Sequence, residues 1–257
     1  MLFMLEVFNL SFHYQPDVPI LTNLTFSVPD GKVVGLLGKN GVGKTTTLKL
    51  ILGLLPIEKG TITLQDCSLD TQPLQYKEKI NYVSDSHDLY NNLTGKEYLN
   101  FIADMYGVST EERRKIYAPL IKEFQVEKYL NQPIKNFSHG TKQKIAIISS
   151  LVNDPQLWVL DEPMTGLDIE AAQILKRLIK SRAGNGKSVL FSSHILEICE
   201  KLCDTIVFIQ KGTIRKTIVL QDNFLDISLE DIYMEVVNDE PLDKDFSTKQ
   251  DNLPIEF

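Results

Sequence analysis

The stretch that decides the fold is residues 33–46, which read VVGLLGKNGVGKTT. A short apolar run at residues 33–37 is followed by a glycine-rich turn. Apolar residues then recur at helical spacing, at Leu48, Ile51, Leu52 and Leu55. The sequence therefore predicts a buried strand, a tight loop and a helix over residues 44–55.

The loop between this strand and this helix matches a phosphate-binding pattern. Residues 38–45 fit G-x-x-x-x-G-K-[ST], and a strand before the loop with a helix after it is the context that supports the match. Glycines let successive backbone N–H groups point at phosphate oxygens, and the helix N-terminus adds the positive end of its dipole. The pattern predicts a triphosphate site that contains Gly38, Asn40, Gly41, Gly43, Lys44, Thr45 and Thr46.

Three side chains of this loop have separate expected roles. Lys44 would bridge the β- and γ-phosphates, Thr45 would bind Mg²⁺, and Thr46 would contact the α-phosphate. The alternative interpretation is a glycine-rich turn with a solvated lysine.

Two carboxylates, Asp161 and Glu162, directly follow a second apolar run at residues 157–160. Ligands of open α/β sheets lie at the carboxyl edge, and successive side chains on a strand diverge, so we expect the two acids to differ in role. Asp161 would hold Mg²⁺, directly or through water. Glu162 would act as general base or orient the attacking water. Alternatively, both acids start a loop that caps the following helix.

A histidine, His194, follows a third apolar run at residues 189–191. Its position after a strand brings it to the same sheet edge, where its imidazole would contact the γ-phosphate. A structural histidine with satisfied hydrogen bonds is the alternative.

Alternation of strands and helices predicts the fold class. A further apolar run lies at residues 206–209, and residues 168–182 carry an apolar face at helical spacing. This order indicates an α/β protein with a parallel sheet. Residues 93–152 read mainly as helices, with capping boxes at Thr94 and Ser109 and a kink or division expected at Pro119.

Composition excludes several classes of protein. The chain has 257 residues with 27 Lys and Arg against 34 Asp and Glu, a net charge of −7 that disfavours nucleic acid as a partner. Three scattered cysteines make no disulfide framework or cysteine-based zinc site. We expect no signal peptide and no membrane span, and we expect an acidic, mobile tail at residues 238–257.

Taken together, the phosphate loop, the acidic strand end and His194 resemble the ATP-binding subunit of an ABC transporter. Three further segments carry the resemblance. Residues 12–14, Phe-His-Tyr, resemble the aromatic loop of the family and make Tyr14 the candidate for stacking on adenine. Residues 136–143 resemble the signature loop, with Ser138 and Gly140 in register, although His139 and Thr141 depart from the usual Gly and Gln. Residues 165–168 resemble the loop after the acidic strand.

A fourth segment departs from the family pattern. Residues 80–85 align with a strand that normally ends in Gln, the residue that contacts Mg²⁺ and water, and Asp85 occupies that place. A carboxylate can bind Mg²⁺, so Asp85 is a candidate metal ligand, with Asp88 as the alternative.

The resemblance implies a fold and a domain organisation. It implies a P-loop NTPase core with a mostly parallel sheet, an N-terminal antiparallel β part and a helical subdomain inserted at about residues 86–152. The ATP-binding domain would cover residues 1–237.

The resemblance also implies a function. Glu162, His194 and Lys44 would catalyse ATP hydrolysis with Mg²⁺. A second ATP-binding subunit would present Ser138 and Gly140 to the nucleotide. A membrane-spanning permease would hold the subunit at the cytoplasmic face of the cell membrane, for export. The alternatives are a regulatory ABC subunit with weak turnover and an ABC ATPase outside transport.

Overall fold

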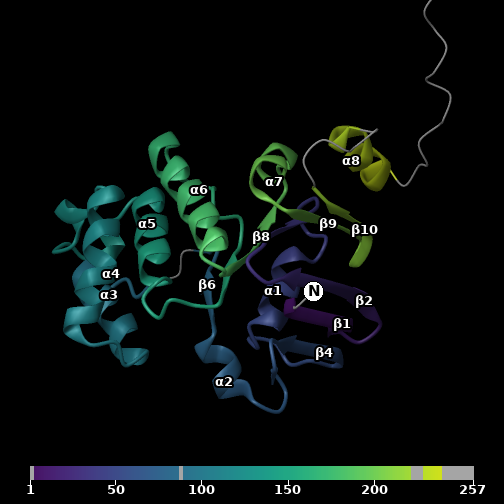
Figure 1. Cartoon of the computed structure of the whole chain (residues 1–257), viewed down its shortest axis with the longest axis horizontal. Helices are drawn as coiled ribbons and strands as arrows, with labels where there is room; N and C mark the ends of the chain where they lie inside the picture. The colour runs from purple at the N-terminus through teal and green to yellow at the C-terminus, as the bar shows by residue number, and fades with distance from the viewer. Residues whose placement is uncertain (1–2, 87–88, 221–227, 239–257) are drawn as a thin grey trace, which may run out of the picture.

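The N-terminal part of the chain forms an antiparallel sheet. The computed structural model describes residues 3–86, 89–220 and 228–238 (Figure 1). Strands β1 (Phe3–Gln15), β2 (Val18–Pro29), β4 (Lys59–Leu64) and β5 (Cys67–Ser68) pair in the order β2-β1-β4-β5, and each neighbouring pair is antiparallel. The expected antiparallel part is therefore confirmed.

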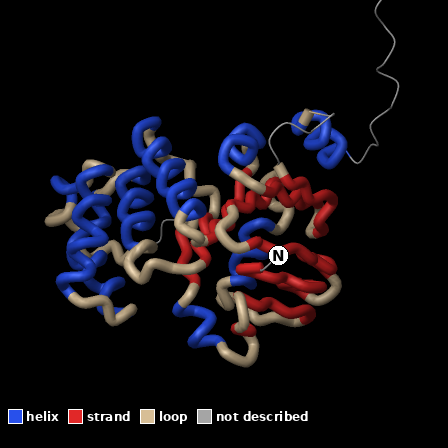
Figure 2. Tube along the Cα trace, viewed as in Figure 1, coloured by secondary structure: helices blue, strands red, loops and turns tan. Residues whose placement is uncertain are grey.

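A second sheet holds the strand that opens the decisive stretch. Its order is β10-β9-β3-β8-β7-β6, with β3 (Val33–Leu37) between β8 (Ser188–Ser193) and β9 (Thr205–Gln210). β7 (Leu157–Leu160) and β6 (Ile80–Val83) follow β8 toward one edge of the sheet. The strands from β9 to β6 are all parallel. Only the edge strand β10 (Thr213–Val219) runs antiparallel. Figure 2 shows both sheets in red, and the prediction of a mostly parallel sheet is confirmed.

Side chains of β3 alternate between two hydrophobic cores. Val34 and Leu36 pack with the antiparallel sheet and with α1 (Lys44–Ile51), whereas Val33 and Leu37 pack on the opposite face. A fully buried parallel strand contributes apolar side chains to both faces. The phosphate loop therefore extends from a strand that is fixed on both sides.

Helix α1 ends earlier than the sequence predicted. Its C-cap is Leu52, and Gly53 follows with φ +63°, in the left-handed conformation that commonly terminates helices. The Leu54 N–H donates to the Lys49 carbonyl. The apolar pattern continues to Leu55, but the glycine ends the helix.

The remaining helices of the described residues pack around the two sheets (Figure 1). They are α2 (Pro73–Glu78), α3 (Gly95–Met105), α4 (Thr110–Glu123), α5 (His139–Ser149), α6 (Ile169–Gly184), α7 (Leu196–Leu202) and α8 (Leu229–Asn238). The 3₁₀ turns η1 (Glu127–Tyr129) and η2 (Ile134–Asn136) join α4 to α5. α3, α4 and α5 thus lie between β6 and β7 in the chain. Across the described ranges, no helix has the length and apolarity needed to span a membrane.

Two expectations fall on residues without a description. Asp88 lies outside the described residues, and so does the tail from residue 239 onward. Asn238 is the last residue of α8.

Helix α4 corrects the prediction that Pro119 could divide it, while the alternative of a kink stays a prediction. The helix runs through the proline without interruption from Thr110 to Glu123. Pro119 and Lys115, four residues earlier, are both exposed, so water can solvate the carbonyl that the proline leaves without its helical partner.

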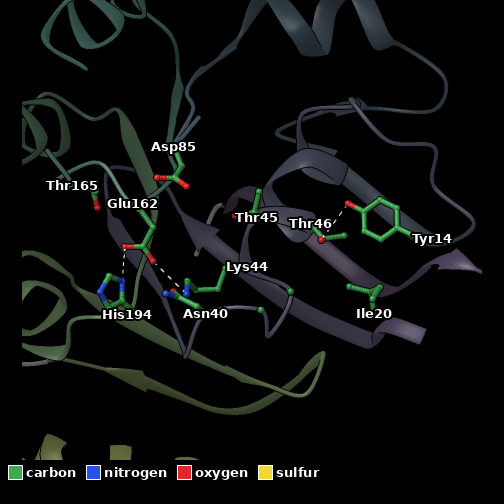
Figure 3. Close-up of a pocket in the computed structure, with 12 residues that line it drawn as sticks. Tyr14, Ile20, Asn40, Lys44, Thr45, Thr46, Asp85, Glu162, Thr165 and His194 are labelled. Atoms are coloured by element: carbon green, nitrogen blue, oxygen red, sulfur yellow. Dashed lines mark hydrogen bonds and ion pairs between the residues drawn. The ribbon is translucent and has the colours of Figure 1, made fainter. Parts of the chain in front are cut away.

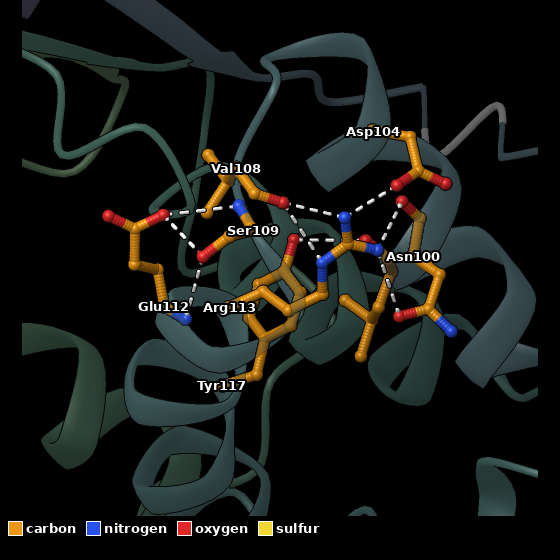
Figure 4. Close-up of polar contacts among 8 residues, drawn as sticks. Asn100, Asp104, Val108, Ser109, Glu112, Arg113 and Tyr117 are labelled. Atoms are coloured by element: carbon orange, nitrogen blue, oxygen red, sulfur yellow. Dashed lines mark hydrogen bonds and ion pairs between the residues drawn. The ribbon is translucent and has the colours of Figure 1, made fainter.

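Both capping boxes form as the sequence predicted. At the start of α4 the Ser109 hydroxyl accepts from the Glu112 N–H at 3.3 Å, and the Glu112 carboxylate accepts from the Ser109 N–H at 3.1 Å (Figure 4). Arg113 then ties the turn to α3, since its guanidinium donates to the Val108 carbonyl and to Asp104. These contacts fix the turn between α3 and α4, in which the Ser109 hydroxyl caps α4.

Ser109→Ala should lower the free energy of unfolding by about 1 kcal/mol, because it leaves an N-terminal amide of α4 without its cap. The hydrogen bonds from Ser109 lower the pKa of Glu112. That stabilisation is present above the unfolded pKa, about 4.3, and is lost as the pH falls through the lower folded value. Urea titrations at pH 7 and pH 3 measure both effects. Thr110→Ala is the control, and equal losses in the two variants would contradict the capping assignment.

Candidate functional site

A cavity of about 550 Å³ lies beside the phosphate loop, where β3, β7 and β8 end (Figure 3). Tyr14 and Ile20 lie at one end of it, and Glu162 and His194 lie at the other, with Lys44 between. The full lining is Tyr14, Ile20, Asn40, Gly41, Gly43, Lys44, Thr45, Thr46, Asp85, Glu162, Thr165 and His194. Because adjacent parallel strands present their carboxyl ends at one edge, segments far apart in sequence meet here.

Two glycines give the phosphate loop its shape. Gly43 has φ +108°, a left-handed conformation that side chains disfavour, and a Cβ there would lie 2.5 Å from the Leu21 side chain. A Cβ on Gly38 would clash with the Ile209 carbonyl oxygen. The loop is therefore packed closely against β2 and β9, and Gly38 does not itself line the cavity.

The Lys44 ammonium is buried and surrounded by oxygen. Its Nζ donates to the Gly38 carbonyl at 2.7 Å and to the Lys39 carbonyl at 3.1 Å, and it lies 3.3 Å from Glu162 Oε1. Only 6% of the side chain is exposed. A buried cation needs such partners because burial removes its hydration. Glu162 Oε1 is buried and makes no hydrogen bond, so it is held by charge alone.

Glu162 also contacts the candidate histidine. Its Oε2 lies 3.0 Å from His194 Nδ1, so the carboxylate bridges Lys44 and His194 (Figure 3). The residue has φ +45°, a conformation that is uncommon for residues other than glycine and that costs on the order of 1–3 kcal/mol. Backbone strain of this kind gathers at functional sites, where the surrounding structure holds it.

Comparison with known proteins decides the family. A sequence model of the family described as ABC transporter matches residues 21–165. The chain belongs to the ABC transporter family. The transporter ATP-binding protein EcsA of Bacillus subtilis (strain 168) is 36% identical over 228 residues, which cover 86% of this chain and 92% of EcsA. The lantibiotic transport ATP-binding protein SrtF of Streptococcus pyogenes is 36% identical over 211 residues, 82% of this chain and 89% of SrtF.

A solved structure agrees with this result. The ATP-binding subunit of an ABC transporter superposes with a TM-score of 0.85 at 34% identity and covers 91% of this chain and 99% of that subunit. The chain is thus an ABC ATP-binding domain and an ATPase by family, and the family and fold that the sequence predicted are confirmed.

Asp161 of this ABC domain lies outside the cavity lining. Its side chain is completely buried, and both carboxylate oxygens accept hydroxyl protons, from Ser192 at 2.5 Å and from Tyr82 at 3.3 Å. Burial and the Asp161 charge raise the pKa of Tyr82, which keeps its hydroxyl protonated as a donor. A role of Asp161 toward Mg²⁺ would therefore act across its partners or through water.

Ser138 and Gly140 do not line the cavity either. The Ser138 hydroxyl caps α5 by accepting from the Thr141 N–H at 3.2 Å. A Cβ on Gly140 would lie 2.6 Å from the Gly166 carbonyl oxygen, so this glycine permits close packing between two loops of the same chain. Ser138 would therefore contact a nucleotide bound at another site rather than one bound in this cavity.

Tyr14 and Asp85 line the cavity as the sequence suggested they should. Tyr14 is 56% exposed, packs its ring edge-on against Phe12 at 4.9 Å and places its hydroxyl 3.4 Å from Thr46 Oγ1. Exposure leaves the Tyr14 ring face available to a planar ligand, which argues against packing in the core as its purpose.

Besides Thr165, sequence reasoning left one residue of the lining out of the predicted site, Ile20. It follows the turn between β1 and β2, where His13 pairs with Pro19. The signal was the hairpin itself, because a second strand that pairs beside Tyr14 brings its own side chains to the same end of the cavity.

Lys44→Ala should weaken ATP binding about ten- to a hundredfold, since it removes a buried charge-assisted donor and leaves the Glu162 carboxylate facing the phosphates. Isothermal titration of the purified chain with ATP measures the change. Lys49→Ala, in the last turn of the same helix and outside the cavity lining, is the charge-matched control. Undiminished binding by Lys44→Ala would remove Lys44 from the site.

Proposed function

We propose that the chain, paired with a second ATP-binding subunit, hydrolyses ATP to drive transport by a separate membrane-spanning partner, and that the direction is export. The observation that carries the proposal is the convergence of Lys44, Glu162 and His194 on one cavity beside the phosphate loop. Export is supported by the similarity to the Nod factor export ATP-binding protein I of Burkholderia orbicola (strain AU 1054), which is 35% identical over 196 residues and whose name states the direction.

Nucleotide binding would begin when a phosphate replaces the Glu162 carboxylate as the anion beside Lys44. In the cavity Lys44 is paired with Glu162, and an incoming phosphate would take that place with the support of the loop amides and the N-terminus of α1. Thr46 and Tyr14 would face the other end of the nucleotide, where the exposed ring would stack on adenine.

Hydrolysis needs a group that takes or orients a proton of water. Once Lys44 has turned to phosphate, the Glu162 carboxylate would be free to accept a proton from the attacking water. His194 would hold the other carboxylate oxygen and contact the γ-phosphate. Its 3.0 Å contact with Glu162 supports this role, because it fixes the direction of the carboxylate.

The cavity also suits Mg²⁺ carried by the nucleotide. Mg²⁺ prefers oxygen ligands and binds through one or two protein groups together with substrate phosphates. The Thr45 hydroxyl and the Asp85 carboxylate line the cavity and would supply such oxygens, with Asp161 behind them. Bound Mg²⁺ would neutralise charge on the phosphates.

A second ATP-binding subunit would complete the site. The cavity opens to solvent, and Ser138 and Gly140 are not among the residues that line it. The family resemblance implies a head-to-tail pair in which these residues meet the partner's nucleotide. Closure would then depend on ATP, since the γ-phosphate would supply contacts that ADP lacks.

The membrane partner and the location follow from this role. Relatives such as EcsA and SrtF are named as ATP-binding proteins of transporters. We place the chain at the cytoplasmic face of the cell membrane, bound through its permease by the helices between β6 and β7.

Glu162→Gln should keep ATP binding and lower turnover about a hundredfold or more, because it removes the proton acceptor while the amide keeps the shape of the side chain. The variant should also accumulate an ATP-dependent dimer. Phosphate release measures turnover, and size-exclusion chromatography with light scattering, with and without Mg-ATP, measures the dimer.

Glu230→Gln, an exposed acid on α8, is the control and should behave as the unaltered chain. Turnover by Glu162→Gln at the control rate would refute the role of Glu162. ATP binding without turnover in the unaltered chain would favour the regulatory alternative.

A further inference from the structure

Ser192 joins the two acids of the site. It is completely buried in β8, two residues before His194. Its hydroxyl donates to Asp161 Oδ1 at 2.5 Å and accepts the Glu162 backbone N–H at 2.9 Å. A single side chain on β8 therefore contacts two consecutive residues that follow β7.

The order of donors and acceptors makes these two bonds depend on each other. A hydroxyl can donate one hydrogen bond, and here Asp161 Oδ1 accepts it. The lone pairs then face the Glu162 N–H. Hydrogen bonds in such a chain polarise one another, so each is stronger in the presence of the other.

The Glu162 backbone has a particular need for this acceptor. With φ +45° the residue holds an uncommon conformation, and its side chain reaches Lys44 and His194 only from that backbone. A conformation of this kind persists when neighbouring contacts fix it. The hydrogen bond from the Glu162 N–H to Ser192 is such a contact.

We propose that Ser192 is a positioning residue for ATP hydrolysis, which sets the direction of the Glu162 carboxylate and the orientation of Asp161 through its hydroxyl. The inference rests on the roles proposed above for these two acids. Ser192 does not line the nucleotide cavity, so it acts through them and touches neither nucleotide nor water in that cavity.

Neighbouring hydroxyls provide matched comparisons. Ser193 is also buried, but among the described residues its hydroxyl makes hydrogen bonds only with the backbone of Ile195. Tyr82 donates to the other Asp161 oxygen at the longer distance of 3.3 Å, and the described hydrogen bonds of its hydroxyl do not include Glu162. A cavity of about 80 Å³ borders Ser192.

The test compares Ser192→Ala, Ser192→Thr and Ser193→Ala in the full chain. We measure kcat and KM for ATP, the Mg²⁺ concentration that gives half-maximal turnover, ATP binding in EDTA, and the melting temperature. For Ser192→Ala we expect kcat to fall about tenfold or more with KM changed less than about threefold, since the nucleotide contacts remain. The Mg²⁺ midpoint should rise, because Asp161 loses a donor that orients it.

Ser192→Thr should recover at least about half of kcat because it keeps the hydroxyl, and Ser193→Ala should stay within about twofold of the unaltered chain. If Ser192→Ala does not fold, Ser192→Cys replaces it under the same criteria, since the slightly larger thiol leaves no void and weakens both bonds.

The proposal fails if kcat of Ser192→Ala equals that of the unaltered chain. It also fails if Ser192→Thr is as slow as Ser192→Ala, or if Ser193→Ala lowers kcat as much as Ser192→Ala does. A third contradicting result is a fall in kcat that comes with a parallel loss of ATP binding and an unchanged Mg²⁺ midpoint. Absence of hydrolysis by the unaltered chain would instead refute the proposed function.

Discussion

The site depends on one buried charge. The Lys44 ammonium is almost completely removed from water and lies against the carbonyls of Gly38 and Lys39 and the carboxylate of Glu162. Removing a cation from water is costly unless oxygen atoms replace its hydration. The fold supplies these oxygens from the ends of β3 and β7, which lie on either side of β8 in the parallel sheet. Packing of the sheet thereby fixes the charge.

That arrangement connects stability with function. The buried ammonium of Lys44 needs an anion beside it, and the Glu162 carboxylate is that anion. Glu162 has a strained backbone conformation, and its N–H donates a hydrogen bond to Ser192. A nucleotide that brings its own phosphates would release Glu162 for chemistry. The carboxylate would then serve first as a partner of Lys44 and later as a proton acceptor, so that the same residue links binding to hydrolysis.

Local patterns predicted the parts of the structure that depend on short stretches of sequence. The parallel sheet, both capping boxes and the meeting of Lys44, Glu162 and His194 followed from apolar runs and their endings, because strand ends meet at one sheet edge. Contacts that depend on how individual side chains and loops pack could not be read in this way. The sequence marked Ser192 only as the start of Ser-Ser-His, and nothing in it revealed that Gly140 packs against Gly166. Pro119 stays within α4 because its surroundings are open to water, which no local pattern encodes.

The most direct test is an experimental structure of the chain with Mg²⁺ and a non-hydrolysable ATP analogue. The decisive quantity is the distance from Lys44 Nζ to Glu162 Oε1, which is 3.3 Å without nucleotide. The account predicts that this distance lengthens beyond contact, with Nζ bonded to the β- and γ-phosphates and the triphosphate seated on the amides of residues 40–46. A structure in which the triphosphate lies elsewhere, or in which Lys44 keeps its contact with Glu162, would contradict it.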